Sequence, residues 1–80
     1  MVIQEKIREF VTHNFYVANP ASLQNAESLL DSGVMDSTGV LELIAFIEET
    51  FAITVEDSEM LPENLDSIDR INNFVIRKTQ

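Results

Sequence analysis

Hydrophobic residues recur every three or four positions in three stretches of the chain, with polar residues between them. Such spacing places the hydrophobic side chains on one face of a helix, so each stretch predicts an amphipathic helix. The first helix is expected over residues 2–16, the second over residues 37–51, and the last from about residue 64 onward. The hydrophobic positions are, in order, Ile3, Ile7, Phe10, Val11 and Phe15; Val40, Leu43, Ile44, Ile47 and Phe51; and Ile68, Ile71, Phe74 and Val75.

A long loop is expected over residues 17–36, between the first two helices. Proline disfavours helix in the residue before it, so Pro20 stops the first helix, and Ser, Asn, Asp and Gly are frequent in the segment that follows. A loop of this length is unusual in a compact domain unless it is functional or anchored. We expect one short helical turn over residues 26–30. The expected anchors are Leu23, Leu29, Leu30, Val34 and Met35.

The connection between the second and last helices is shorter. Residues 52–55 are apolar and β-branched but have no strand to pair with, so a buried loop is expected there. Residues 56–61 predict a short helix that ends before Pro62, and Asn64, Leu65 and Asp66 are expected as the cap and acidic first turn of the last helix. The sequence therefore predicts an all-α fold: a small four-helix bundle with three main helices, one short helix and the long loop.

Length and composition fit one small domain over residues 1–80, expected to be a monomer. The chain has 80 residues, of which 45% are hydrophobic, enough for a single core. It has no Cys, so neither a disulfide nor a thiolate nucleophile is available. No long apolar stretch occurs near Met1, which argues against a secretory signal and a membrane span. We expect a cytoplasmic protein without membrane insertion.

The formal net charge is −9, and its distribution is uneven. The Lys and Arg residues lie near the two ends of the chain, whereas residues 31–69 contain eleven acidic residues and no basic one. Such a segment repels nucleic acid and anionic membranes. It is either a solvated surface that maintains solubility or a face that attracts basic partner proteins.

Four Asp-Ser pairs occur in the chain, at residues 31–32, 36–37, 57–58 and 66–67. Only Asp36-Ser37 joins the long loop to the most regular helix, where Asp36 is the expected N-cap and Ser37 lies in the first turn. The unpaired amides there favour an anion, so a phosphodiester on Ser37 would be stabilised. The alternative is that both residues only cap the helix. Gly39 follows in the same turn, where a small residue gives room to its neighbours.

The residues around this pair resemble those of the acyl carrier protein family. The resemblance rests on segments 29–37, 41–44 and 46–51, which read LLDSGVMDS, LELI and FIEETF, and on NLDSI at 64–68. It extends over nearly the whole chain, because the first helix, the long loop, the acidic second helix and the short third helix follow the family's order. What it implies is a carrier with a four-helix, acyl-carrier-like fold.

The resemblance also implies a cofactor and a set of partners. A phosphopantetheinyl transferase would attach 4′-phosphopantetheine from coenzyme A to Ser37, with Asp36 helping to bind the transferase's magnesium. Cargo would be loaded by an acyl or aminoacyl ligase, held as a thioester, and passed to synthases or transferases with basic docking faces in fatty acid, polyketide or related biosynthesis. The carrier itself would be non-catalytic, in agreement with the residues: nothing near Ser37 could activate a nucleophile, and His13 is expected at the surface.

One departure bears on the cargo. Family members commonly have Leu or Met directly after the serine, but this chain has Thr38, followed by Gly39. The same segment is also similar to aminoacyl and D-alanyl carriers, so that cargo class remains an alternative. The residues expected to contact partners are Thr38, Leu41, Glu42, Ala45, Glu48, Glu49, Glu56, Asp57 and Glu59.

Three further possibilities follow from the same segments. Phe46, Ile47, Met60 and Leu61 could line an acyl pocket between the second and third helices, although core packing is the simpler interpretation. The acidic face could belong to a helical interaction module without a prosthetic group. Divalent ions could bind at Glu56, Asp57, Glu59 and Glu63, although no calcium-loop motif is present.

Overall fold

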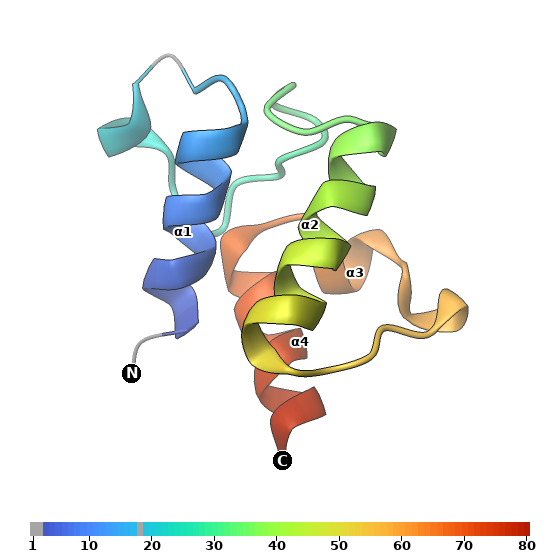
Figure 1. Cartoon of the computed structure of the whole chain (residues 1–80). Helices are drawn as coiled ribbons and strands as arrows, with labels where there is room; N and C mark the ends of the chain where they lie inside the picture. Colours follow the sequence, from blue (N-terminus) through green and yellow to red (C-terminus); the bar gives the residue numbers. More distant parts are fainter. Residues whose placement is uncertain (1–2, 18) are drawn as a thin grey trace.

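The computed structural model describes residues 3–17 and 19–80 and contains four α-helices over those ranges (Figure 1). They are α1 (Ile3–Asn14), α2 (Ser37–Phe51), α3 (Pro62–Leu65) and α4 (Ile68–Thr79), with 3₁₀ turns η1 (Pro20–Ser22) and η2 (Asp57–Glu59). No strand occurs among the described residues, and the predicted all-α, four-helix plan is confirmed. Val2, the expected first residue of the first helix, lies outside the described residues.

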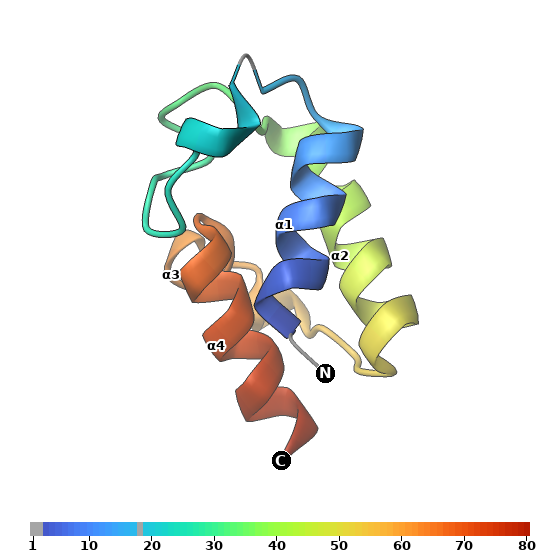
Figure 2. The ribbon, with the colours of Figure 1, turned by 90° about the vertical axis from the view of Figure 1, so that its left-hand side faces the viewer.

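The helices share one hydrophobic core. Helix α4 packs mainly against α1 and α3, and α2 contacts both α1 and α4. Figure 2 shows α2 beside α1. The amphipathic faces predicted from the sequence supply most of this core, because their periodicity directs the side chains of each helix to the same side. The buried residues are Ile7, Val11, Leu23, Leu29, Met35, Leu43, Ile44, Ile47, Val55, Leu65, Ile68, Ile71, Phe74 and Val75.

The long loop closes the end of the bundle where α2 begins (Figures 1 and 2). Leu23, Leu29 and Met35 are buried as predicted, whereas Val34 is half-buried and Leu30 is 37% exposed. The short helical turn expected over 26–30 is wrong. It lies at η1 instead, because the fixed φ of Pro20 suits a first helical position.

Two side chains tie this loop to the helices. From α1, Arg8 donates to the carbonyl of Leu23, to Oδ1 of Asn25 at 2.7 Å and to the carbonyl of Pro20 at 3.2 Å. From the other side, Asp66 accepts hydrogen bonds from Ser28 Oγ at 2.6 Å and from the Leu30 amide at 2.8 Å. The loop is therefore anchored by polar contacts as well as by buried leucines.

The connection after α2 differs from its prediction in burial. Residues 52–55 form no strand, as expected, but only Val55 is buried, while Ala52 and Thr54 are exposed. Helix α2 ends because Ala52 adopts the left-handed conformation, with φ of 56°. The carboxylate of Glu48 accepts a hydrogen bond from the Val55 amide at 2.9 Å and holds the departing chain against the helix.

The short helix and the last cap also differ from their predictions. Segment 56–61 contains only the turn η2, and α3 begins at Pro62, which occupies a first helical position instead of stopping a helix. The expected cap at Asn64-Leu65-Asp66 is wrong. Ser67 is the N-cap of α4, because its Oγ accepts from the Arg70 amide at 3.0 Å.

Candidate functional site

Asp36 and Ser37 form the start of α2, as predicted. Asp36 is the N-cap: its Oδ1 accepts a hydrogen bond from the Gly39 amide at 2.7 Å, and its carbonyl accepts from the Val40 amide at 3.0 Å. The carboxylate thus satisfies one of the amides that a helix leaves unpaired at its N-terminus. Ser37 is the first residue of the helix, and its side chain is exposed. The site therefore presents a hydroxyl to solvent beside a fixed carboxylate.

Gly39 allows the end of α1 to approach this turn closely. A Cβ at this position would lie 2.8 Å from Cε1 of Phe15 and 3.0 Å from Cγ of Met35, closer than carbon atoms normally pack. Because Gly39 has no side chain, Phe15 and Met35 pack directly against the first turn of α2. The prediction that Gly39 makes room is confirmed, and the room is filled by core side chains.

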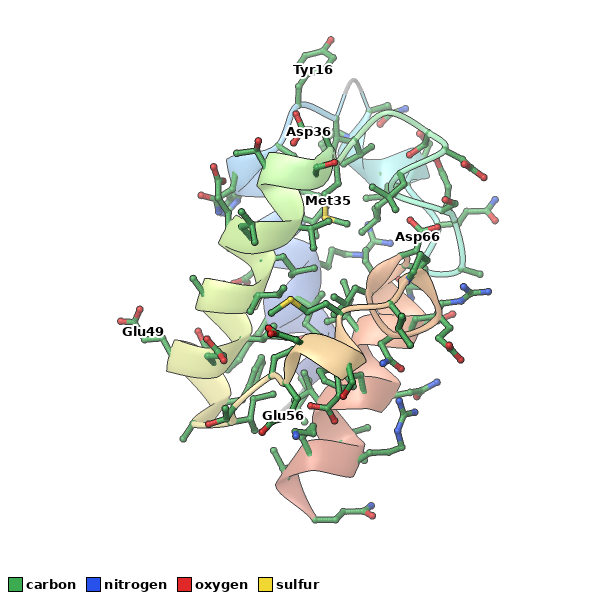
Figure 3. All side chains as sticks on the ribbon, turned by 90° about the vertical axis from the view of Figure 1, so that its right-hand side faces the viewer. Tyr16, Met35, Asp36, Glu49, Glu56 and Asp66 are labelled. Atoms are coloured by element: carbon green, nitrogen blue, oxygen red, sulfur yellow. The ribbon has the colours of Figure 1, made fainter. Side chains whose placement is uncertain are left out.

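The other Asp-Ser pairs occupy different surroundings. Ser67 is only 3% exposed, and its hydroxyl caps α4, while Asp66 points back to the loop (Figure 3). Ser32 lies in the loop and donates to the Leu29 carbonyl at 3.3 Å. Ser58 belongs to the three-residue turn η2. Within the described chain, Ser37 alone among these serines combines exposure with the first turn of a long helix.

The residues predicted to contact partners fall into two groups. Most are exposed, and Leu41 stands out as a large apolar side chain that is 63% exposed. Glu49 points away from the bundle in Figure 3, and Glu56 is also exposed. The exposed members are Thr38, Leu41, Glu42, Ala45, Glu49, Glu56 and Asp57.

Glu48 and Glu59 do not fit the expectation of exposed acidic residues. Both are half-buried, and each is engaged within the molecule. Glu48 holds the chain after α2, as described above, whereas Glu59 forms an ion pair with Lys78 of α4 at 2.9 Å. The Glu56 amide also donates to Glu59 Oε1 at 2.9 Å. That hydrogen bond, together with Lys78, holds the pKa of the Glu59 carboxyl below its ordinary value.

An apolar pocket of about 100 Å³ lies beside the start of α2. Met60 and Leu61 line it as predicted, together with Leu30, Met35, Val40 and Leu65. The predicted contributions of Phe46 and Ile47 are wrong. Phe46 stacks on the ring of Phe10 with centroids 4.3 Å apart, and Ile47 is fully buried in the core.

The acidic residues after α2 do not assemble into an ion site. No group of three or more His, Asp or Glu side chains within residues 3–17 and 19–80 is placed to hold a metal ion. Glu56, Asp57, Glu59 and Glu63, which were considered for divalent ions, form no such group. His13 is exposed, as expected. Over the same residues, no helix is long and apolar enough to cross a membrane.

No protein-family model matches this chain. It is similar to an acyl carrier protein of Buchnera aphidicola subsp. Schizaphis graminum, with 38% identity over 73 residues, or 89% of this chain and 91% of that protein. It is also similar to a D-alanyl carrier protein of Streptococcus pyogenes serotype M5, with 35% identity over 71 residues, or 89% and 87%. A D-alanyl carrier protein of Streptococcus suis strain 05ZYH33 is 42% identical over 50 residues, or 62% and 63%.

Two of these matches extend over most of both chains. The chain belongs to the carrier protein family that includes the acyl and D-alanyl carrier proteins. It is a carrier, and proteins of this family are generally non-catalytic.

Proposed function

We propose that Ser37 is the attachment point of a 4′-phosphopantetheine arm, on which the chain carries its cargo. The observation that supports this proposal is the exposed Ser37 hydroxyl, held at the first position of α2 by the Asp36 cap. A phosphodiester there would lie at the positive end of a helix of 15 residues. The arm would supply the thiol that this chain, which lacks Cys, does not have.

The loading reaction is a transfer of phosphopantetheine from coenzyme A. A bond forms between Ser37 Oγ and phosphorus, the pyrophosphate bond of coenzyme A breaks, and adenosine 3′,5′-bisphosphate leaves. The proton of the hydroxyl passes to a base of the transferase. Asp36 contributes a second oxygen, Oδ2, beyond the one that caps the helix, and this oxygen can help bind the transferase's magnesium.

Intact mass measurement tests the attachment. Native protein and the Ser37→Ala variant are incubated with coenzyme A, magnesium and a broad-specificity transferase. We expect the native mass to rise by one phosphopantetheine and the variant mass to stay unchanged. Ser32→Ala is the matched control, since it removes a nearby hydroxyl from the same segment and should load normally. An unchanged native mass, or an equal gain on Ser37→Ala, would reject the site.

The cargo is an acyl or an aminoacyl group, and the small pocket favours the latter. Its volume of about 100 Å³ lies well below the range of about 300–1,000 Å³ that is usual for small-molecule sites, so it shelters only a few methylene groups. A D-alanyl group needs no such shelter, and D-alanyl carriers are among the similar proteins. Melting temperatures of aminoacyl-loaded and long-chain acyl-loaded protein test this preference. Marked stabilisation by the long chain alone would show that the pocket opens for fatty cargo.

Partner enzymes would dock on the exposed acidic side of α2, around Leu41. Complementary charge raises the rate of encounter more than it tightens a complex, which suits a carrier that visits a ligase, a transferase or a synthase in turn. Replacement of Glu42 and Glu49 by Lys should slow transfer at low salt and have little effect at high salt. Equal rates at low salt would count against this acidic side of α2 as the docking face. We place the carrier, as a monomer, in the cytoplasm.

A further inference from the structure

A second pocket, larger and more polar than the apolar one, opens at the end of the molecule that carries Ser37. Its volume is about 320 Å³, within the range of about 300–1,000 Å³ that is usual for small-molecule sites. One wall is the chain that follows α1, and the other is the loop segment that precedes α2. The residues that matter here are Tyr16, Val17, Asn19, Ser22, Ser32 and Val34. We call it the loop pocket.

The loop pocket is within reach of a group attached to Ser37. Val34 is separated from Ser37 by three steps of the chain, and an extended chain spans at most about 11 Å over that distance. Figure 3 shows Tyr16 and Asp36 at the same end of the molecule. A phosphopantetheine arm is longer than this, because pantoate, β-alanine and cysteamine units follow its phosphate. Its pantetheine portion can therefore fold back onto the loop.

The lining of the loop pocket matches the alternating chemistry of the arm. Val17, Val34 and the Tyr16 ring offer apolar contact to methyl and methylene groups. Ser22 Oγ donates to the Asn19 carbonyl at 2.9 Å and Ser32 Oγ to the Leu29 carbonyl, so both hydroxyl oxygens keep lone pairs for an amide N–H. The one polar side chain that lines the apolar pocket is that of Asp66, whose carboxylate already accepts from Ser28 Oγ and the Leu30 amide, so amides placed there would lose water with little replacement.

Tyr16 is the aromatic residue that lines the loop pocket. Its side chain is 85% exposed and stands at the rim of the loop pocket, where its ring can contact a group that occupies the pocket. We infer that the loop pocket is the resting place of the unloaded arm, with Tyr16 covering it from the solvent side. The inference rests on the proposed attachment at Ser37.

Nuclear Overhauser measurements on the holo protein test the location directly. Protein labelled with ¹³C and ¹⁵N is loaded from unlabelled coenzyme A, and its mass gain is confirmed first. We expect contacts between the methyl protons of the arm and the side chains of Tyr16 and Val34. Contacts to Val40 and Leu61, which line the apolar pocket, or no contacts to the protein, would overturn the inference. An absent mass gain would instead reject the proposed attachment, so the two failures are distinguishable.

Thiol alkylation gives a second, kinetic readout. An arm that spends about two thirds of its time in the pocket should react with iodoacetamide about threefold faster once the pocket is lost. We expect that increase for holo Tyr16→Ala, whose core is intact because Tyr16 is 85% exposed. Ile76→Ala is the control, since Ile76 is also an exposed apolar residue but lies on α4. An unchanged rate for Tyr16→Ala, or an equal increase for Ile76→Ala, would contradict the inference.

Discussion

The same dipeptide opens two helices of this protein and serves a different purpose at each. At α2, Asp36 is the cap and the following Ser37 is exposed in the first turn. At α4, the cap is Ser67, the second residue of the pair. Its hydroxyl is buried and accepts a hydrogen bond from the Arg70 amide. Asp66, no longer needed as a cap, binds the long loop.

The difference between the two pairs is a shift of one residue relative to the helix start. When the Asp caps, the serine hydroxyl is left for chemistry with partners; when the Ser caps, its hydroxyl is used within the fold. Both pairs have the same sequence, Asp-Ser, so the surrounding residues determine whether the Asp or the Ser is the N-cap. Long-range contacts of Asp66 fix the α4 arrangement, and Gly39 with Phe15 supports the α2 arrangement.

The largest effect on stability is expected from Asp66→Ala. The variant loses two hydrogen bonds to a carboxylate, and each such bond contributes about 1.5–3 kcal/mol at most sites. Because the site is partly exposed, we expect the free energy of unfolding to fall by about 3 kcal/mol in urea titrations. Asp31→Ala, in the same loop, should change it by less than about 0.5 kcal/mol. Equal effects of the two variants would show that Asp66 does not anchor the loop.

Asp36→Asn separates the two roles of the cap at α2. Asn caps a helix about as well as Asp, so stability should change little. Loading by a magnesium-dependent transferase should slow by about tenfold, because the charge that helps bind the metal is lost. Steady-state loading rates and thermal melts on the same samples check both expectations. A normal loading rate would limit Asp36 to capping.

Gly39→Ala should disturb the support beneath Ser37. The added methyl group would meet Phe15 and Met35 at 2.8 Å and 3.0 Å, and overpacking of this kind costs about 1–3 kcal/mol. Since Ala also favours the helix, we expect a net loss of about 1 kcal/mol in the free energy of unfolding. Thr38→Ala, in the same turn but exposed, is the matched control. No loss in Gly39→Ala would mean that the Phe15 ring shifts without cost.

Ser67→Ala and Ser37→Ala should have opposite consequences. Removing the α4 cap costs about 1 kcal/mol of stability, and loading should proceed as in the native chain. Removing the exposed Ser37 hydroxyl should leave stability within about 0.5 kcal/mol and abolish loading. Chemical denaturation and intact mass, measured on both variants, make the comparison. Any loss of loading in folded Ser67→Ala would contradict the division of roles.

The smallest effect concerns another carboxylate that accepts a hydrogen bond from a backbone amide, that of Glu59. Its pKa is lowered first by the Glu56 amide and then by Lys78, so its contribution to stability is present above the ordinary value of 4.5 and is lost as the pH falls through the lowered pKa. In Lys78→Met, a carboxyl titration followed by NMR should show a higher Glu59 pKa. The value should remain below the ordinary one, because the amide still donates. No change would exclude a role for Lys78.

Local patterns predicted the parts of this fold that depend on local rules. The periodicity gave the three main helices and their core faces, and Asp36 before a regular helix was enough to identify the α2 cap. The sequence also pointed to Leu23, Leu29 and Met35 as anchors of the loop. These predictions needed only spacing and the preferences of single residues.

The wrong predictions concern residues whose roles depend on distant partners or on a choice between two local rules. Asp66 binds an amide 36 residues away, which no local pattern reveals. The sequence predicts that a helix ends before Pro62, although proline equally suits the start of one. The predicted positions of α3 and of the α4 cap are therefore both wrong. A Ser directly before the periodic residues from Ile68 was the available signal for the correct cap.

Mapping the modified serine tests the central claim most directly. The native chain is loaded from coenzyme A, digested, and each of the peptides with an Asp-Ser pair is sequenced by mass spectrometry. The account predicts that all of the added phosphopantetheine is on Ser37 and none is on Ser32, Ser58 or Ser67. Added mass on any of those three serines, with Ser37 unmodified, would contradict it.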